Sequence, residues 1–437
     1  MHLSTYYYQY SVAQKCAKPS LGIRFLATCS TVLHRPSSKK GRSLTRKTKS
    51  LKMKRLIFLA MLLPLLSAKA IKVTHGPYIC DMDSTGLTIM WVTDKPGRAW
   101  VEIADDTMGH FYGKERPRYY ATLHGRRLLT DSVHCVRIDG LKPDTHYRYR
   151  IFSEPVEKWK YDDWITYGKI TATDVWRGKP HEFRTFPVQP RDFTFLVLND
   201  IHERADFMKE LCKNVDFNKV DFVLLNGDMS SRINSQDHLF QAYIDSCVSM
   251  FATRVPILFN RGNHELRGPF ADNLYRYFPT RTGKYYRLQH VCGVDFLFID
   301  SGEDKPDSDI EYSGITEYDA YREEQAKWLR EMQANKTLGR YPVVAFSHMP
   351  PTLEDWHGPY HMQKTIVPEL NKMNVKVMLS GHLHRYGYEK PGEIINFPNL
   401  VNSNNTYLLC QVKGGKMEVD YVGLNSKEKK HFTFPLK

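Results

Sequence analysis

The stretch Phe193-Thr-Phe-Leu-Val-Leu-Asn-Asp-Ile-His202 decides the fold, because a mostly apolar run ends here on a carboxylate and an imidazole. A run that is apolar on both faces predicts a strand in a sheet that helices cover. Comparable runs recur at residues 220–225, 255–259, 342–346 and 375–379. Helix-like segments separate several of them, at residues 205–214, 236–251, 321–334 and 365–373. This alternation of strands and helices predicts an α/β fold for residues 189–437.

Polar side chains follow each of these five runs at its carboxyl end. In order along the chain they are Asp200 and His202, Asp228, Asn263 and His264, His348, and His382 and His384. Ligands of open α/β sheets bind at the carboxyl ends of the strands. A single pair of this kind is weak evidence, because histidine is common in packing and surface positions. Five endings in order on five strand-like runs indicate one functional site.

The residue types at these endings indicate metal binding. Carboxylate and amide oxygens mixed with imidazoles, without a thiolate, suit divalent or trivalent Mn, Fe, Zn or Ni. Seven ligands are too many for one ion that also holds water and substrate, so they favour two metals sharing one carboxylate. Two metals about 4 Å apart can hold a hydroxide nucleophile and clamp a phosphoryl oxygen. The predicted ligands are Asp200, His202, Asp228, Asn263, His348, His382 and His384.

The order DxH, GD, GNHE, H and GHxH resembles the calcineurin-like metallophosphoesterase superfamily over residues 193–388. The β-rich segment before it makes the chain most similar to purple acid phosphatases. The resemblance implies a two-sheet β-sandwich flanked by helices, with the metals between strand ends. It also implies catalytic roles for Asp228 and His264, the latter at the scissile phosphate and leaving group. The implied ligand sets are Asp200, His202 and His384 for one metal, Asn263, His348 and His382 for the other, and Asp228 as the bridge.

The sequence departs from the purple pattern at the second motif. Purple acid phosphatases carry a metal-binding tyrosine in GDxxY and a glycine in the first motif. Here Ser231 stands at the tyrosine position and His202 in the first motif. Replacing an anionic oxygen by a neutral imidazole favours a divalent ion. We therefore expect a colourless enzyme with two divalent metals (Mn, Fe or Zn) that works nearer neutral than acid pH, unless another tyrosine such as Tyr243 reaches the site.

Several other polar residues lie beside the motifs. Arg261 and Arg267 flank GNHE and could bind phosphate bidentately, with a surface salt bridge as the alternative for each. Glu265 could hydrogen-bond a ligand or the nearby backbone. His357 and His361 could line the substrate pocket, although an exposed loop is the favoured interpretation.

Residues 71–188 read as short strands broken by turn residues, which predicts an all-β sandwich. Residues 87–92, 100–103 and 133–138 are the clearest runs. The following Leu-x-Pro-x-x-x-Tyr-x-Tyr run, residues 141–149, looks like a tyrosine corner. The segment therefore resembles a fibronectin type III domain. At the other end of the chain, the β-like runs 406–412 and 417–423 are expected to complete the second sheet.

The net charge of +14 comes from the first 70 residues, which hold fourteen Lys and Arg and no Asp or Glu. The rest of the chain is formally neutral, so its charge gives no support to nucleic-acid binding.

Residues 53–70 have the positive start, short apolar run and small-x-small end of a signal peptide. Residues 1–52 are then a disordered upstream extension, with an organellar transit peptide as the alternative. We expect a secreted or periplasmic protein that begins at Ile71 and has no membrane span.

The leading hypothesis is an exported phosphoesterase acting on a small phosphorylated substrate, with monoesters favoured. Phosphodiesters and nucleotide pyrophosphates remain alternatives, because the motifs do not determine the leaving group. A contrasting hypothesis is a non-catalytic adhesion protein that uses the fibronectin-like segment.

Six cysteines follow position 70 without a CxxC pair, so a zinc–thiolate site is disfavoured. Cys80 and Cys135 could form a disulfide, although free cysteines are at least as plausible.

Overall fold

The computed structural model describes residues 70–437, apart from residues 106–107, 163, 336 and 338. The predicted extension and all but the last residue of the predicted signal peptide lie outside the described residues. Within the described part of the chain, no helix is both long enough and apolar enough to cross a membrane.

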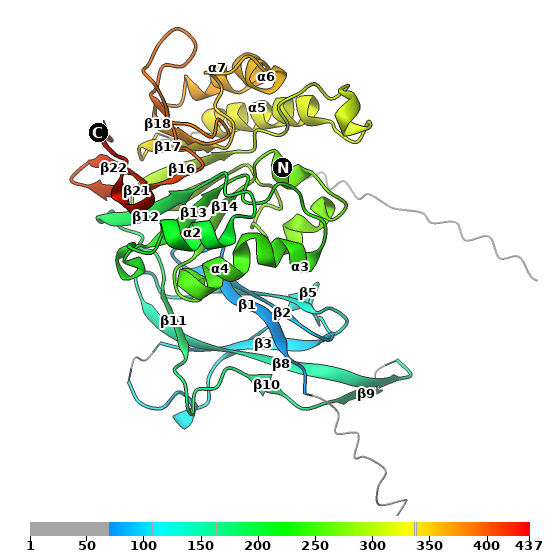
Figure 1. Cartoon of the computed structure of the whole chain (residues 1–437). Helices are drawn as coiled ribbons and strands as arrows, with labels where there is room; N and C mark the ends of the chain where they lie inside the picture. The colour runs from blue at the N-terminus through cyan, green and yellow to red at the C-terminus, as the bar shows by residue number, and fades with distance from the viewer. Residues whose placement is uncertain (1–69, 106–107, 163, 336, 338) are drawn as a thin grey trace, which may run out of the picture. The chain divides into compact units, whose positions relative to one another are not determined.

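Two stacked sheets contain the strands of residues 189–437, and three strands from the N-terminal segment join the first of them (Figure 1). The first has nine strands in the order β23-β22-β21-β12-β13-β14-β1-β2-β7, and the second has the order β15-β16-β17-β18-β20-β19. All five predicted runs are strands, so the mixed α/β fold is confirmed. They are β12 (Phe193–Leu198), β13 (Phe222–Asn226), β14 (Ile257–Asn260), β17 (Val343–Ser347) and β18 (Val375–Ser380). The second sheet adds β15 (Arg287–Val291), β16 (Val294–Ile299), β19 (Gly387–Glu389) and β20 (Asn399–Val401).

Side-chain alternation along these strands creates three apolar cores. On β12, Phe195 and Val197 face the core between the two sheets, whereas Leu196 and Leu198 face the helices on the other side. On β16, Leu297 and Ile299 face a third core, beneath the helices that cover the second sheet. Each strand buries both faces, which is why its sequence reads as an unbroken apolar run.

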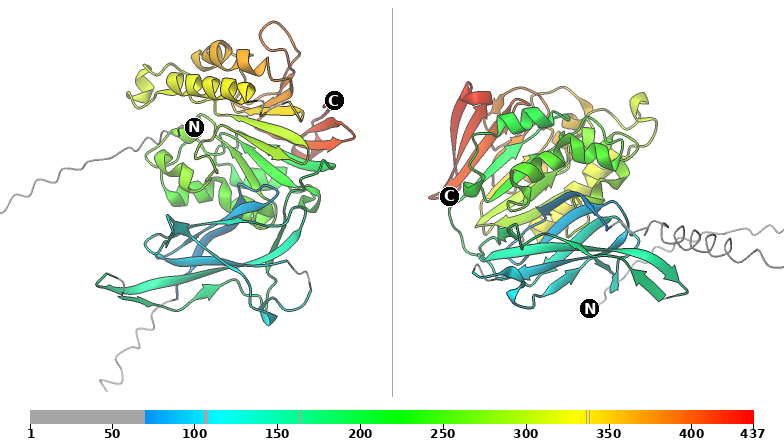
Figure 2. Two further views of the ribbon diagram at one scale, coloured as in Figure 1. Left: turned by 180° about the vertical axis from the view of Figure 1, so that it is seen from behind. Right: turned by 60° about the horizontal axis from the view of Figure 1, so that its bottom comes forward.

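Helices cover the outer face of each sheet (Figures 1 and 2). The first sheet is covered by α2 (Ala205–Leu211) and by a run made of α3 (Gln236–Leu239), η3 (Phe240–Ile244), α4 (Asp245–Cys247) and η4 (Val248–Ala252). The second sheet is covered by α5 (Tyr318–Ala334), α6 (His357–Thr365) and α7 (Val367–Leu370). Short 3-10 helices lie in the connections: η2 (Phe217–Lys219), η5 (His264–Leu266), η6 (Ala271–Arg276), η7 (Ile310–Tyr312) and η8 (Leu424–Ser426).

The C-terminal strands lie in the first sheet, so the expectation that they complete the second sheet is wrong. They are β21 (Thr406–Lys413), β22 (Lys416–Gly423) and β23 (Lys429–Pro435). Strand β21 pairs antiparallel with β12, the edge that β13 leaves open. Its alternate side chains fit both cores that the first sheet borders: Leu408 and Cys410 join the core between the sheets, and Tyr407 joins the core under the helices.

The N-terminal segment is β-rich, as predicted, but three of its strands extend the first sheet. β1 (Val73–Cys80) pairs in parallel with β14 through Cys80 and Ile257. β2 (Gly86–Thr93) and β7 (Val133–Asp139) follow. The remaining strands form a separate sheet around β3 and β8, which packs on β2, where Trp91 donates to Ser153 Oγ at 2.9 Å. They are β3 (Gly97–Ala104), β4 (Arg118–Tyr120), β8 (His146–Lys160), β9 (Trp164–Tyr167), β10 (Thr171–Ala172) and β11 (His181–Arg184). A small hairpin, β5 (Thr122–Leu123) with β6 (Arg126–Arg127), and the turn η1 (Phe111–Gly113) complete the segment.

The predicted tyrosine corner is present, because the Tyr147 hydroxyl accepts a hydrogen bond from the Lys142 N–H at 2.9 Å. All six cysteines after position 70 are free. Cys80 and Cys135 cannot pair, since Cys80 lies opposite Thr88 on one side of β2 and Cys135 lies opposite Met90 on its other side. A whole strand therefore separates them, and a disulfide needs Cα atoms within about 7 Å.

Candidate metal centre

The predicted ligands come from the carboxyl ends of strands in both sheets. β12, β13 and β14 run parallel, and so do β16, β17, β18 and β20. Their ends therefore meet at one edge of the stacked sheets. The loops there are tied together through the backbone, since the Asp200 N–H donates to Gly227 O at 3.0 Å and the Gly381 N–H to His348 O at 2.8 Å.

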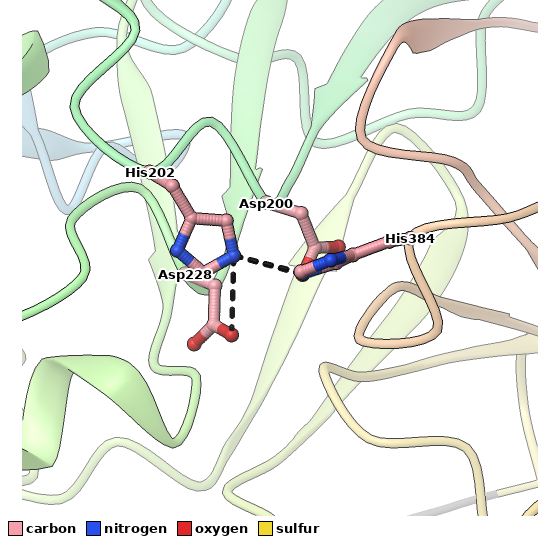
Figure 3. A group of neighbouring side chains, drawn as sticks. All are labelled: Asp200, His202, Asp228 and His384. Atoms are coloured by element: carbon pink, nitrogen blue, oxygen red, sulfur yellow. Dashed lines mark hydrogen bonds and ion pairs between the residues drawn. The ribbon is translucent and has the colours of Figure 1, made fainter.

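Four side chains form the first cluster: Asp200, His202, Asp228 and His384 (Figure 3). One potential ligand atom from each lies within 4.8 Å of the others. The Nε2 atoms of His202 and His384 are 2.9 Å apart. His384 Nε2 is 3.3 Å from Asp200 Oδ1, and His202 Nε2 is 3.9 Å from Asp228 Oδ2. Two imidazole nitrogens and two carboxylates thus converge on one point.

Asp228, His348 and His382 form the second cluster, which shares Asp228 with the first. His348 Nε2 lies 3.0 Å from Asp228 Oδ2. The Asn263 amide adjoins this cluster, with one of its terminal atoms 3.1 Å from His382 Nδ1 and 3.3 Å from Asp228 Oδ2. The seven predicted ligands therefore lie together, divided as the resemblance implied, with Asp228 common to both groups.

The backbone at the cluster is held in an unusual conformation. Asp200, His202, Asp228, His382 and His384 all have positive φ angles, between 48° and 70°. Residues other than glycine seldom adopt this region, at a cost of about 1–3 kcal/mol each. Such strain persists where the surrounding structure enforces it, and it gathers here on the ligand set.

Glycines of the motifs permit close approach of the loops. A Cβ on Gly262 would lie 2.3 Å from Asp228 Oδ1, and a Cβ on Gly227 would lie 2.5 Å from His348 Nδ1. Gly227 also has a φ of +87°. These positions of GD and GNHE therefore exclude a side chain.

Neighbouring groups fix the tautomers of two histidines. His348 Nδ1 lies 2.8 Å from Asn226 O, and His264 Nδ1 lies 2.9 Å from Ser231 O. A carbonyl can only accept, so each Nδ1 carries a proton and each Nε2 faces the site. His264 Nε2 lies 3.9 Å from Asp228 Oδ2, beside both clusters.

Glu265 acts on the backbone rather than on the cluster. Its buried carboxylate accepts from Asp228 N at 2.8 Å, Met229 N at 2.7 Å and Gly262 N at 2.9 Å. It thus joins the loop after β13 to the loop after β14. The backbone alternative for Glu265 is therefore correct.

The residues present fit bound metal ions. Asp200 and Asp228 are completely or almost completely buried. Asp200 Oδ1 and His348 Nε2 have no hydrogen bond of good geometry among the described residues. Burial lowers the pKa of His348, but the two carboxylates outweigh burial and raise it to about 10. The pocket therefore concentrates negative charge and open ligand atoms. The Asn263 nitrogen can donate to Asp228 Oδ2 and His382 Nδ1 at 3.3 and 3.1 Å, whereas a cation between these acceptors would favour the amide oxygen in its place.

Of the two arginines that flank GNHE, Arg267 lies beside the clusters and Arg261 lies away from them. Arg267 makes a double contact with Glu303, at 2.9 and 2.8 Å, and its Nη1 is 3.2 Å from His264 Nε2. It therefore borders the site. Arg261 pairs with the buried Asp300 at 2.6 Å and lines a hollow with Lys284 and other residues outside the two clusters.

Ser231 and Tyr243 bear on the kind of metal. Ser231 Oγ lies 3.5 Å from His202 Nδ1, at the edge of the first cluster. Tyr243 is buried in the core under the helices, stacked on Phe278. Burial, reinforced by Glu265, raises the pKa of Tyr243 well above 10, so it stays a neutral phenol. His357 and His361 contact Asp319 of α5 instead of either cluster, at 2.8 and 3.5 Å.

Sequence reasoning missed Glu354, which lies 3.2 Å from His382 Nε2. No motif marks it, because it comes from a loop six positions after His348 and belongs to none of the strand endings.

Comparisons with known proteins agree with this geometry. Residues 193–386 match the calcineurin-like phosphoesterase family, and residues 79–167 match the purple acid phosphatase N-terminal domain. The chain contains a calcineurin-like phosphoesterase domain behind a purple acid phosphatase N-terminal domain. These matches support a metal-dependent phosphoesterase.

Two relatives extend the comparison. Purple acid phosphatase 15 of Arabidopsis thaliana is 22% identical over 298 residues, which cover 61% of this chain. The match covers 50% of that relative's length. The structure of purple acid phosphatase PPD1 from yellow lupin (Lupinus luteus) seeds is similar with a TM-score of 0.55 and 12% identity, covering 82% of this chain and 73% of that one. At this identity the structural likeness concerns the fold.

Proposed function

We propose that this chain is an exported phosphoesterase that uses two divalent metal ions to hydrolyse phosphate monoesters. One observation carries the proposal: two ligand clusters share the buried Asp228 at the strand ends of a calcineurin-like domain. Seven ligands divided around one carboxylate suit a pair of ions better than a single one.

The chain's own side chains would divide the work as follows. Asp200, His202 and His384 would hold one ion, Asn263, His348 and His382 would hold the other, and Asp228 would contribute to both sites. Bound ions of this kind activate a water for attack on phosphorus and neutralise the phosphoryl oxygens. His264, with Nδ1 fixed by Ser231 O, directs Nε2 at the substrate and would protonate the leaving group in the imidazolium form, in which Nε2 also carries a proton. Arg267 beside it binds a phosphoryl oxygen. A similar role for Arg261 has less support, because Asp300 occupies its guanidinium.

Both metals should be divalent Mn, Fe or Zn. A serine at position 231 cannot give the tyrosinate that a purple Fe(III) centre needs, and Tyr243 is a buried neutral phenol. His202 adds a neutral donor in place of an anionic one. A divalent ion lowers the pKa of bound water less than a trivalent ion, so activity nearer neutral pH follows.

Two further parts of the proposal concern the rest of the chain. The tyrosine corner at Tyr147 supports a fibronectin-like N-terminal segment. Export rests on the signal-like residues 53–70, with cleavage that leaves Ile71 as the first residue. Sequencing the N-terminus of the exported protein tests this, and recovery of residues 1–52 would contradict it.

Hydrolysis assays with metal analysis test the main proposal. The purified protein should contain two divalent ions per chain, lack a visible absorption band, and cleave p-nitrophenyl phosphate faster than its bis ester. A preference for the bis ester would favour the phosphodiesterase alternative. Asp228→Asn should lose both metal and turnover, with His431→Gln on β23 as the control. Absence of metal and turnover in the unaltered protein would leave the adhesion hypothesis.

A further inference from the structure

The side chain of Glu354 lies against the outer nitrogen of a predicted metal ligand. Its Oε2 is 3.2 Å from His382 Nε2. This oxygen is buried and makes no hydrogen bond of good geometry with the described residues. On the other side of the same ring, His382 Nδ1 faces Asn263 at 3.1 Å and so points into the second cluster. The imidazole therefore lies between a carboxylate and the cluster.

The chemistry of imidazole connects its two sides. A neutral ring carries one proton, and the nitrogen without the proton is the one that can bind a metal. If Nδ1 held the proton, the Nε2 lone pair would face the Glu354 carboxylate, and two acceptors would oppose each other. If Nε2 holds the proton, the N–H faces the Glu354 carboxylate 3.2 Å away, and the Nδ1 lone pair stays directed at the cluster.

The loop that carries Glu354 is itself held under strain. Leu353, the preceding residue, has a φ of +76°, a region that costs a branched residue more than it costs Asn, Asp or Gly. Thr352 Oγ1 donates to Glu389 Oε2 of β19 and so ties the loop to the second sheet. Strain of this kind persists only where the surrounding structure enforces it, and here it lies directly before Glu354.

We propose that Glu354 is a positioning residue that fixes the Nε2–H tautomer of His382 and thereby sets the metal affinity of the Asn263, His348 and His382 site. Glu354 itself binds no metal. It acts through His382, as carboxylates hydrogen-bonded to metal-ligating histidines do, and loss of such partners costs about 10- to 100-fold in affinity. The proposal rests on the two-metal centre proposed above, but not on the identity of the substrate.

Metal binding without substrate tests the proposal. The full chain, stripped of metal and titrated with Mn²⁺ by calorimetry, should bind two ions. Glu354→Ala should weaken one of them 10- to 100-fold and leave the other unchanged. Glu354→Gln, which keeps an oxygen that can accept from Nε2, should restore part of that loss. Glu369→Gln removes the charge of another buried glutamate, on α7, and should bind as the unaltered protein does.

Spectroscopy and folding controls separate positioning from general damage. Co²⁺ bound to Glu354→Ala should show altered visible bands for one site only, while the melting temperature without metal stays that of the unaltered protein. Unchanged affinity at both sites in Glu354→Ala, equal loss at both sites, or failure of the unaltered protein to bind metal would overturn the proposal. If metal binds as expected and phosphate esters remain uncleaved, the proposed function fails while the role of Glu354 stands.

Discussion

At the scale of single residues, His264 has the clearest separable role. It adjoins the predicted ligand Asn263 in sequence, yet its Nε2 belongs to neither cluster and lies 3.9 Å from Asp228 Oδ2. His264→Ala should keep both metals and lose about 10²- to 10⁴-fold in rate, most for esters with basic leaving groups. Rates for p-nitrophenyl and alkyl phosphates, measured beside metal content, check this.

The contact with Arg267 makes that comparison informative. In the structure Arg267 Nη1 lies 3.2 Å from His264 Nε2, where it donates to the nitrogen that must hold a proton for acid catalysis. A loss in His264→Ala that is equal for both kinds of ester would mean that the pair only positions phosphate. His290→Ala, a histidine of β15 that contacts Asp295, serves as the control.

His134 makes stability depend on pH. It is buried on β7, with Nε2 2.8 Å from Thr93 Oγ1, and burial lowers its pKa to about 4. The unfolded chain therefore binds the proton more readily, and the free energy of unfolding falls as the pH drops from about 6.5 to 4, by roughly 3 kcal/mol. The histidine's contribution is fully present at neutral pH.

Denaturant unfolding at pH 7 and pH 4.5 measures this effect. His134→Gln should lose less stability between the two pH values than the unaltered protein, whatever its stability at pH 7. His431→Gln, at an exposed histidine, should show the same loss as the unaltered protein. An identical pH dependence in His134→Gln would rule out this source of acid sensitivity.

At the scale of elements, Gly262 shows how two loops share one space. A Cβ there would lie 2.3 Å from Asp228 Oδ1 and 2.5 Å from Asp228 N. Gly262→Ala should displace the shared carboxylate, destabilise the fold by about 1–3 kcal/mol, and reduce bound metal. Metal analysis and thermal melting check this. Gly392→Ala, whose Cβ would meet only Lys390 O at 3.9 Å, is the control; equal behaviour of the two variants would contradict the crowding argument.

The strands and their polar endings were predictable because they are local features. Residues 193–198 read as one apolar run and form one strand. The predicted ligands follow such runs directly, so parallel strands alone were enough to bring them together. Glu354 was not predictable, because its role depends on a loop conformation and on a partner from another strand end.

The sheet that each strand joins was equally unpredictable from the sequence. Nothing in residues 73–80 distinguishes a strand of a separate sandwich from a strand that pairs with β14. A strand in either position buries apolar side chains, so the local pattern is the same. The same holds for residues 406–413, whose alternation suits either sheet. Pairing partners far apart in sequence depend on how whole layers pack, which local patterns do not encode.

At the scale of the whole molecule, the first sheet passes through both segments of the described chain. β1, β2 and β7 continue the sheet of β12–β14, and one core contains Trp91, Phe195 and Phe346. The Tyr149 hydroxyl also donates to Thr253 O at 2.7 Å. These shared layers predict one cooperative unfolding transition for residues 71–437.

Calorimetry of the metal-loaded protein checks this expectation. A chain of residues 189–437 alone would leave the edge of β14 unpaired and the core open where Trp91 packs. It should melt well below the longer chain or aggregate. Two separate transitions in the longer chain, or equal stability of the shorter one, would show that the segments are independent.

The place of β21 in the first sheet has a consequence for synthesis on the ribosome. β12 is translated long before β21, which pairs with one of its edges and is among the last strands to be made. Pairs so distant in sequence raise contact order and slow folding. Until the C-terminus is released, residues 193–198 present an apolar open edge, the kind of edge on which chains associate. Early termination after β20 would therefore yield an aggregation-prone product even though every predicted metal ligand had already been made.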